Sequence, residues 1–239
     1  MGLIRGGEIL RLVKAKCEPF RENFAGKNVT ISRFLPPTII GDRLLAKYRA
    51  AEISAVEKVK TFSYLNCDVN YLLLSSSATP LEFREIIENA NANEDTIGII
   101  IQNPIPKLLV PELRFLSPNK DLDGMQPLHP LSLFRTSATS EAIVRLVRAF
   151  ATENSQVAVV GGRGFVGGGV VYLLELYAIK SLVLALGDDL TRTNEANIVV
   201  SATGVPEILN ETHLNSSHQL VVDAGFIPIA NKVVFFSVM

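Results

Sequence analysis

Short apolar segments that alternate with helical segments most constrain what this chain can fold into. The clearest strand candidates read TIGIIIQ, QVAVV, SLVLAL and NIVVS. Between such strands lie helical patterns such as PLEFREIIENANA, which has Thr79 as a cap and Pro80 at its first position. This alternation predicts an α/β fold with helices packed around a mostly parallel sheet.

The composition is that of an ordinary globular protein with one large domain or two small ones. Of 239 residues, 48% are hydrophobic and 20% are charged, which is ample for a buried core. Because 23 basic residues balance 24 acidic ones, no overall field would attract phosphate backbones or anionic membranes. We therefore expect neither nucleic acid nor a membrane as a partner.

The N-terminal segment, the cysteines and the histidines exclude further classes. Charged residues interrupt the apolar residues of the first 20 positions, so the segment does not read as a secretory signal, and nowhere is there an apolar stretch long enough to span a membrane. Two cysteines, Cys17 and Cys67, suggest neither a disulfide framework nor a zinc site. The three histidines lack metal-ligand spacing. We expect a cytoplasmic protein without a metal site.

Two series of α/β elements flank the turn-rich segment SPNKDLDGMQPLHP. The second series opens with the amphipathic pattern TSEAIVRLVRAFATE and continues through a strand, a glycine loop and a helix. We predict a domain boundary near residue 135, which gives one domain over residues 1–135 and another over residues 136–239.

A glycine loop follows the strand QVAVV and opens a helix. Gly162, Gly164 and Gly167 have G-x-G-x-x-G spacing. At a helix N-terminus, backbone amides without side chains can approach a pyrophosphate, and the helix dipole favours its negative charge. The loop therefore predicts a dinucleotide site, although such a turn can also serve only to pack a helix on a sheet.

Two signals conflict over which dinucleotide would bind. Asp188 lies at the end of the next strand, where an acid accepts hydrogen bonds from a ribose 2′-hydroxyl, which favours NAD. Arg163 within the loop could pair with the 2′-phosphate of NADP. Asp188 and Asp189 could also be solvated turn residues. Our preference is for NAD.

Five segments carry a family resemblance when they are read in order. They are GIIIQNPIP, KDLDGMQP, VVGGRGFVG, SATGVP and VVDAG. In the first two, the matching residues are Gln102, Pro104, Pro106, Lys120, Asp121, Asp123, Gly124 and Pro127. In the third they are Gly161, Val166 and Gly167, while Gly162 and Arg163 depart from the pattern. Over nearly the whole chain, the sequence resembles the methylenetetrahydrofolate dehydrogenase/cyclohydrolase family.

The resemblance implies two α/β domains, an N-terminal folate-binding domain and a C-terminal Rossmann-like domain for NAD or NADP, with a cleft between them. It implies hydride transfer from 5,10-methylenetetrahydrofolate to the nicotinamide, followed by hydrolysis of the methenyl ring. A homodimer is also implied. The cofactor-side candidates are Thr139, Gly161, Gly162, Arg163, Gly164, Gly167, Asp188, Thr203, Gly204 and Gly225.

On the folate side, the resemblance makes Tyr48, Gln102 and Asp123 the candidate site residues, with Asp123 on the pterin. Glu52 occupies the position of the lysine in the family's Tyr-x-x-x-Lys helix motif. Without the resemblance, Gln102 could simply end a strand and Asp123 could stabilise an Asp-Gly turn. Lys58 lies about 9 Å beyond Glu52 along such a helix, so we do not expect it to replace the missing lysine.

Other departures concern the end of the chain and the linking helix. The family's Pro-Cys-Thr-Pro segment is SATS here and keeps only Thr139, and the sequence ends at KVVFFSVM before the family's terminal Pro-Gly-Gly segment. We expect one side of the folate cleft to be more open.

These features give one leading hypothesis and two alternatives. Hydride transfer needs chiefly alignment, whereas ring hydrolysis also needs managed protons, so loss of a lysine should harm the hydrolase more. The leading hypothesis is a dehydrogenase whose cyclohydrolase activity is weak or absent. The alternatives are a full bifunctional enzyme and a catalytically silent relative that binds nucleotide or folate.

Overall fold

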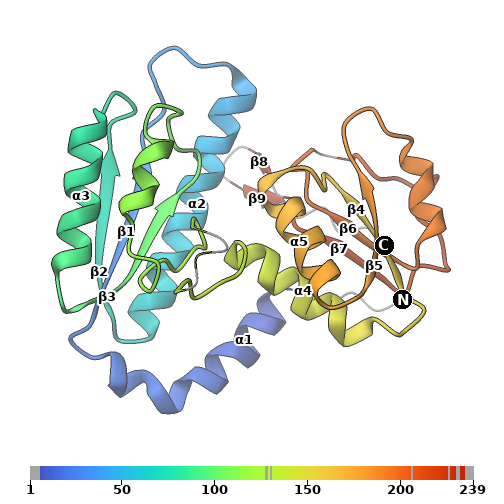
Figure 1. The fold of residues 1–239 in the computed structure, drawn as a ribbon, viewed down its shortest axis with the longest axis horizontal. Helices are drawn as coiled ribbons and strands as arrows, with labels where there is room; N and C mark the ends of the chain where they lie inside the picture. The colour runs from blue at the N-terminus through green and yellow to red at the C-terminus, as the bar shows by residue number, and fades with distance from the viewer. Residues whose placement is uncertain are drawn as a thin grey trace. The chain divides into compact units, whose positions relative to one another are not determined.

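A computed structural model describes residues 6–126, 129, 131–205, 207–225, 227–229 and 232–234 of the chain. The chain divides into two compact units, Gly2–Leu133 (the first unit) and Phe134–Met239 (the second unit), whereas the sequence predicts a boundary near residue 135. The main sheet of each unit is parallel and carries helices (Figure 1). The predicted α/β class is therefore confirmed.

The first unit is built on a three-stranded parallel sheet with the order β2-β1-β3. Its elements, in chain order, are α1 (Gly6–Cys17), η1 (Glu18–Phe24), β1 (Asn28–Phe34), α2 (Asp42–Tyr64), β2 (Asp68–Leu74), α3 (Pro80–Ala92), β3 (Thr96–Gln102) and η2 (Val110–Phe115).

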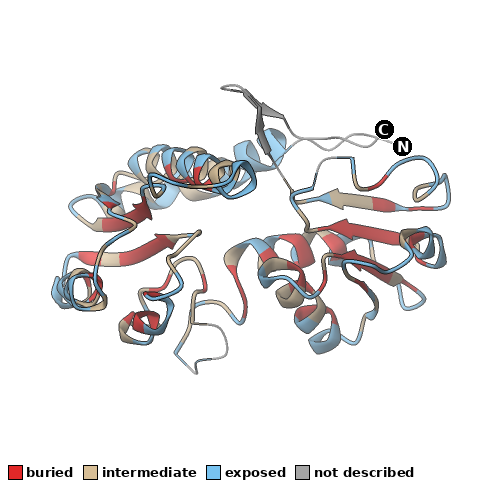
Figure 2. Cartoon of the chain, turned by 90° about the horizontal axis from the view of Figure 1, so that it is seen from above, coloured by how far each residue is buried: buried red, intermediate tan, exposed pale blue. Residues whose placement is uncertain are grey.

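Helices cover both faces of this sheet because side chains of a strand alternate between its faces. On one face, Ala55 of α2 packs with Val29 and Ile31 of β1. On the other face, Phe83 of α3 packs with Phe34, and their rings meet edge to face 5.4 Å apart. Buried residues accordingly gather on the strands and on the inner sides of the helices (Figure 2).

The second unit has a four-stranded parallel sheet with the order β5-β4-β6-β7 and a separate antiparallel pair, β8 and β9. Its elements are α4 (Ala138–Phe150), β4 (Gln156–Val160), α5 (Phe165–Leu176), β5 (Lys180–Leu184), η3 (Leu190–Glu195), β6 (Ile198–Ser201), β7 (Leu220–Asp223), β8 (Ile227–Ile229) and β9 (Lys232–Val234).

The order of the strands places a switch point beside β4. The chain leaves β4 for β5 on one side and later returns to β6 on the other side. Open parallel sheets bind ligands in the crevice beyond the carboxyl ends of strands at such a point. The segment that follows β4 is the glycine loop.

Two absences apply to the described part of the chain. None of its helices combines the length and apolar character that a membrane span requires. No group of three or more histidine, cysteine, aspartate or glutamate side chains within it could hold a metal ion.

The N-terminus of α3 provides a first test of how local sequence supports the fold. Thr79 Oγ1 accepts from the Glu82 amide, and the Glu82 carboxylate accepts from the Thr79 amide at 2.7 Å. We expect Thr79→Ala to lower the free energy of unfolding by about 1 kcal/mol, because helix amides lose their partner. Urea unfolding of the full chain measures this. Thr61→Ala, within α2, is the control, and an equal loss in both variants would contradict the capping role.

Candidate functional site

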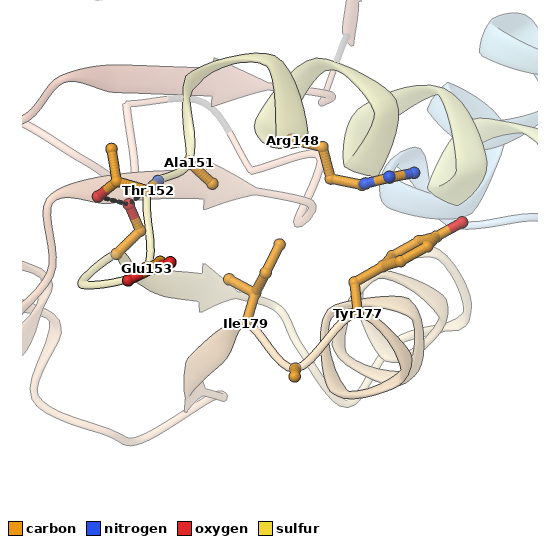
Figure 3. Close-up of a pocket in the computed structure, with 8 residues that line it drawn as sticks. Arg148, Ala151, Thr152, Glu153, Tyr177 and Ile179 are labelled. Carbon is orange, nitrogen blue, oxygen red and sulfur yellow. Dashed lines mark hydrogen bonds between the residues drawn. The ribbon is translucent and has the colours of Figure 1, made fainter.

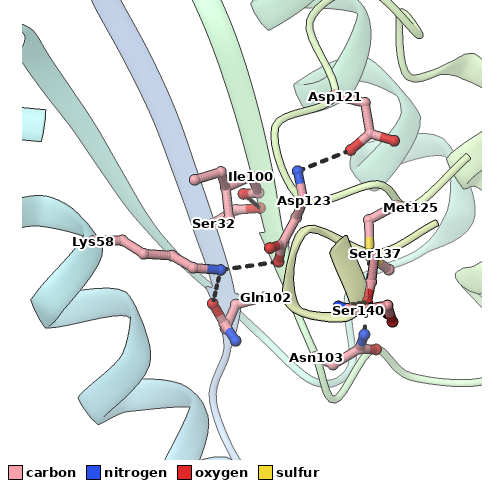
Figure 4. A network of polar contacts seen from close by, with 10 residues as sticks. All are labelled: Ser32, Lys58, Ile100, Gln102, Asn103, Asp121, Asp123, Met125, Ser137 and Ser140. Atoms are coloured by element: carbon pink, nitrogen blue, oxygen red, sulfur yellow. Dashed lines mark hydrogen bonds and ion pairs between the residues drawn. The ribbon is translucent and has the colours of Figure 1, made fainter. Parts of the chain in front are cut away.

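Lys58, Gln102 and Asp123 form a polar cluster in the first unit (Figure 4). Lys58 Nζ donates to Gln102 Oε1 and to Asp123 Oδ2, and both distances are 2.9 Å. The side chains of Lys58 and Asp123 are 26% and 18% exposed, so the ion pair is partly shielded from water. A helix, a strand end and a loop thus bring an amine, an amide and a carboxylate together.

The loop that carries Asp123 is fixed against β3. Ile99 donates its amide to the Lys120 carbonyl at 2.7 Å, and Leu122 donates its amide to the Ile99 carbonyl at 3.1 Å. The buried Asp121 accepts from the amides of Asp123 and Gln126. The Lys-Asp-x-Asp-Gly turn is therefore held in place beside the strand that ends in Gln102. Pro127 lies outside the described residues.

The position of Lys58 bears on one expectation from the sequence. Its offset along the helix led us not to expect it to replace the missing lysine, yet Gln102 and Asp123 both contact it. The offset of about 9 Å is that from Glu52, whereas the reach of a lysine depends on where the neighbouring strand and loop end.

Glu52 has a different partner. Its carboxylate Oε1 accepts from Arg33 Nη2 at 2.7 Å, and Arg33 Nε donates to the Tyr71 hydroxyl at 2.6 Å. The Arg33 side chain is only 8% exposed, whereas that of Glu52 is 54% exposed. Glu52 therefore forms an ion pair with Arg33 of β1, on a different side of α2 from Lys58.

Tyr48 lies in the hydrophobic core of the first unit. It packs in the cluster that contains Phe34, Leu74 and Phe83, and it is 6% exposed. Burial raises the pKa of the Tyr48 phenol, which keeps it protonated. Among the described residues, no hydrogen bond joins Tyr48 to Gln102 or Asp123.

The glycine loop of the second unit requires its glycines. Gly161 has φ +81°, in the left-handed region that other residues rarely adopt. A Cβ atom on Gly167 would lie 2.2 Å from the Gly161 carbonyl oxygen. Gly164 is the N-cap of α5 and has no side chain to occupy the helix amides. These amides are thus available to an anion at the helix N-terminus.

The ends of three strands meet beside this loop. A Cβ atom on Gly161 would lie 3.0 Å from Thr203 Cγ2, and one on Gly225 would lie 2.9 Å from the Gly204 amide nitrogen. Thus Gly161, Thr203, Gly204 and Gly225 lie together after β4, β6 and β7.

The remaining cofactor-side candidates differ in their exposure. Gly162 is a buried residue of the loop, whereas Arg163 and Thr139 are exposed. Thr139 lies in the first turn of α4, whose N-cap is Ser137.

Asp188 belongs to the turn that follows β5. Its Oδ2 accepts from the Ala185 amide at 2.7 Å, which uses one of the two carboxylate oxygens. The neighbouring Asp189 caps η3, and its hydrogen bonds with the hydroxyl and amide of Thr191 lower the pKa of its carboxyl group. Both acids stabilise local turns, and the exposed Asp188 remains accessible to a ligand.

A cavity of about 470 Å³ opens elsewhere in the second unit (Figure 3). Arg148, Thr152, Tyr177 and Ile179 line it, and the Arg148 guanidinium lies 3.9 Å from the Tyr177 ring centroid. These residues precede β4 and β5 in the chain, so the cavity lies at the amino ends of the strands. It is therefore distinct from the glycine loop, which follows the carboxyl end of β4.

Sequence reasoning missed Arg33 and Tyr71 and discounted Lys58. A usable signal was the charged Arg33 within the otherwise uncharged run VTISRFL, because a buried cation in a strand needs a partner. No comparable signal marks Tyr71.

Comparisons with known proteins agree with one another. Residues 137–235 match the model for the NAD(P)-binding domain of tetrahydrofolate dehydrogenase/cyclohydrolase. A bifunctional protein FolD of Chlamydia caviae is 30% identical over 198 residues, which cover 76% of this chain and 69% of the relative.

Two solved structures share the fold. A bifunctional FolD from Campylobacter jejuni has a TM-score of 0.74 at 19% identity and covers 95% of this chain and 81% of that chain. A bifunctional methylenetetrahydrofolate dehydrogenase/cyclohydrolase from Thermoplasma acidophilum has a TM-score of 0.74 at 21% identity and covers 98% and 84%, respectively.

The glycine loop offers a sharp test of ligand binding. Gly167→Ala should weaken dinucleotide binding about tenfold, because the new methyl group displaces the Gly161 carbonyl and overpacking of this kind costs roughly 1–3 kcal/mol. Gly168→Ala is the matched control, since its Cβ would make an ordinary 3.6 Å contact. Calorimetric titration with NAD and NADP measures both variants. Wild-type affinity in a folded Gly167→Ala protein would show that dinucleotide binding does not need the close approach of Gly167 to the Gly161 carbonyl.

Proposed function

The chain belongs to the tetrahydrofolate dehydrogenase/cyclohydrolase family, and we propose that it oxidises 5,10-methylenetetrahydrofolate with a nicotinamide dinucleotide and then hydrolyses the methenyl product. The contact of Lys58 with Gln102 and Asp123 carries this proposal. The sequence alone favours a dehydrogenase with a weak or absent cyclohydrolase step, because Glu52 stands at the lysine position. Lys58 supports the bifunctional alternative.

We assign Lys58 the part of the lysine in the Tyr-x-x-x-Lys motif. The residue four positions earlier is then Ser54, and not Tyr48. Positions i and i+4 share a helix face, so Ser54 rather than a phenol would neighbour the reacting centre. The buried environment of Tyr48 supports this reassignment, since its ring contributes to the core.

Ring hydrolysis needs a group that exchanges protons. Water adds to the methenyl carbon, one carbon–nitrogen bond breaks and a formyl product results; of the two protons that the water loses, one is released to solvent and the other is in effect carried to the departing ring nitrogen. We propose that Lys58 makes this transfer: its ammonium group gives a proton to the ring nitrogen and is restored by the proton from the water. Gln102 orients the Lys58 amine, while Asp123 balances its charge and binds the pterin.

The residues of the glycine loop fit a dinucleotide. Open amides at the start of α5 and the close approach of Gly167 to Gly161 suit a pyrophosphate. When bound, the nicotinamide supplies the hydride acceptor for the dehydrogenase reaction. The loop glycines would hold the phosphates, and Thr139, Thr203, Gly204 and Gly225 would orient the rest of the molecule.

Asp188 favours NAD over NADP. A carboxylate after β5 accepts hydrogen bonds from ribose hydroxyls and repels a 2′-phosphate. Arg163 is exposed on the adjacent loop and is the group that would favour NADP instead.

Turnover measurements test the proposed function. Purified protein is incubated with methylenetetrahydrofolate and either NAD or NADP, and reduced dinucleotide is followed by absorbance. Hydrolysis of methenyltetrahydrofolate is followed separately. Binding of both ligands without turnover would instead identify a catalytically silent relative.

Lys58→Met should lower methenyltetrahydrofolate hydrolysis about 10²-fold or more, because it removes the proton-exchanging group. Hydride transfer should fall less, since it depends mainly on alignment. Steady-state rates of the two reactions measure the difference. Lys60→Met on the same helix removes an exposed lysine that pairs with Glu57, and it should leave both rates unchanged. A fully active Lys58→Met hydrolase would exclude the proposed role.

Asp188→Asn should shift preference towards NADP about tenfold, because a hydrogen bond to a charged group contributes roughly 1.5 kcal/mol. The asparagine keeps an oxygen for the Ala185 amide, so the turn should persist. The ratio of kcat/KM with NAD to that with NADP gives the effect. Asp189→Asn, which changes the cap of η3, is the neighbouring control. An unchanged ratio in Asp188→Asn would contradict the assignment of Asp188 as the residue that favours NAD.

A further inference from the structure

Arg33 is a buried cation of the first unit that the proposed mechanism does not use. It lies on β1, its side chain is 8% exposed, and its guanidinium is held by the Tyr71 hydroxyl on β2 and the Glu52 carboxylate on α2. A desolvated guanidinium is costly unless its donors are satisfied. Arg33 therefore links two strands to one particular point on the helix.

Glu52, where Arg33 contacts α2, and Lys58 lie on opposite flanks of the buried apolar stripe of this helix. At 100° per residue, Glu52 and Lys58 are about 120° apart around the helix and about 9 Å apart along it. Between them lies Ala55, which is fully buried against Val29 and Ile31. The helix thus rests on the sheet along an apolar stripe with one charged contact on each flank.

The two charged contacts end on adjacent strands. Arg33 and Gln102 are direct partners in the parallel pairing of β1 with β3. Glu52 binds the first of these residues and Lys58 binds the second. The two contacts consequently fix the rotation of α2 about its axis relative to a single pair of strand residues.

We propose that the Arg33–Glu52 ion pair is a positioning device that sets this rotation and thereby delivers the Lys58 amine to Gln102 and Asp123. This inference rests on the proposed function, in which Lys58 exchanges the proton. A rotation of about 20° would move a group at a radius of about 6 Å by about 2 Å. Displacements near 1 Å can cost about 10²-fold in rate.

Apolar packing fixes this rotation less narrowly than a directional contact does, even though Tyr48 of the same helix lies in the core. Hydrophobic attraction has no direction, and the helix presents the small side chains of Ala51 and Ala55 to the core beside Glu52. An ion pair with a 2.7 Å hydrogen bond is directional. Removal of Glu52 should therefore leave α2 packed, with its rotation near Lys58 less narrowly set.

The test uses the full chain with Glu52→Ala, Glu52→Gln and the control Glu57→Ala. Glu57 lies on the same helix in an exposed pair with Lys60, and its loss should change nothing. Glu52→Ala should lower kcat for methenyltetrahydrofolate hydrolysis about tenfold with little change in KM, because a displaced Lys58 affects chemistry more than binding. Glu52→Gln keeps an acceptor for Arg33 and should retain more activity.

A double variant separates positioning from general stability. In a Lys58→Met background, Glu52→Ala should have no further effect on hydrolysis, because the residue it positions is gone. Wild-type kcat in Glu52→Ala, or an equal further loss in the Lys58→Met background, would overturn the positioning role while leaving the role of Lys58 intact. Wild-type hydrolysis by Lys58→Met alone would overturn the proposed function, and this inference with it.

Discussion

The sharing of one ammonium group between Gln102 and Asp123 is the interaction on which the candidate site of the first unit depends. Lys58 Nζ lies 2.9 Å from both oxygens, one from a neutral amide and one from a carboxylate. Each partner comes from a separate element, so the contact forms only when α2, β3 and the loop after η2 are all in place. A long, flexible lysine loses conformational freedom in such a geometry, which two good acceptors offset.

The second unit depends on a different constraint, namely the small space between the loops that follow its strands. Parallel strands end at one edge, so the loops after β4, β6 and β7 converge there, and glycines allow them to approach closely. Glycines and backbone groups make up much of this region, whereas side chains make up the cluster of Lys58, Gln102 and Asp123. In the proposed function, one unit thus offers backbone amides to a phosphate and the other offers side chains to a reacting ring.

Patterns that depend on neighbours in the chain could be predicted, and contacts between distant elements could not. Alternating apolar segments predicted the α/β class, and the position of the glycine loop between a strand and a helix follows from QVAVV and the residues after it. Lys58 was discounted because its place was judged from Glu52 along one helix. Its partners lie 44 and 65 residues away in the chain, where helical spacing carries no information.

In the proposed assignment the two halves of α2 have different roles, because the catalytic lysine lies six residues beyond the position that the Tyr-x-x-x-Lys motif indicates. Tyr48 in the first half is buried in the core, and burial raises the pKa of its phenol. Lys58 in the second half is partly exposed beside polar partners. Tyr48 and the residue four positions later fit the spacing of the motif, but the surroundings of a side chain decide whether it can take part in a reaction. Glu52 lies between the halves and binds Arg33 of β1, and in the proposed assignment it anchors the helix that carries Lys58.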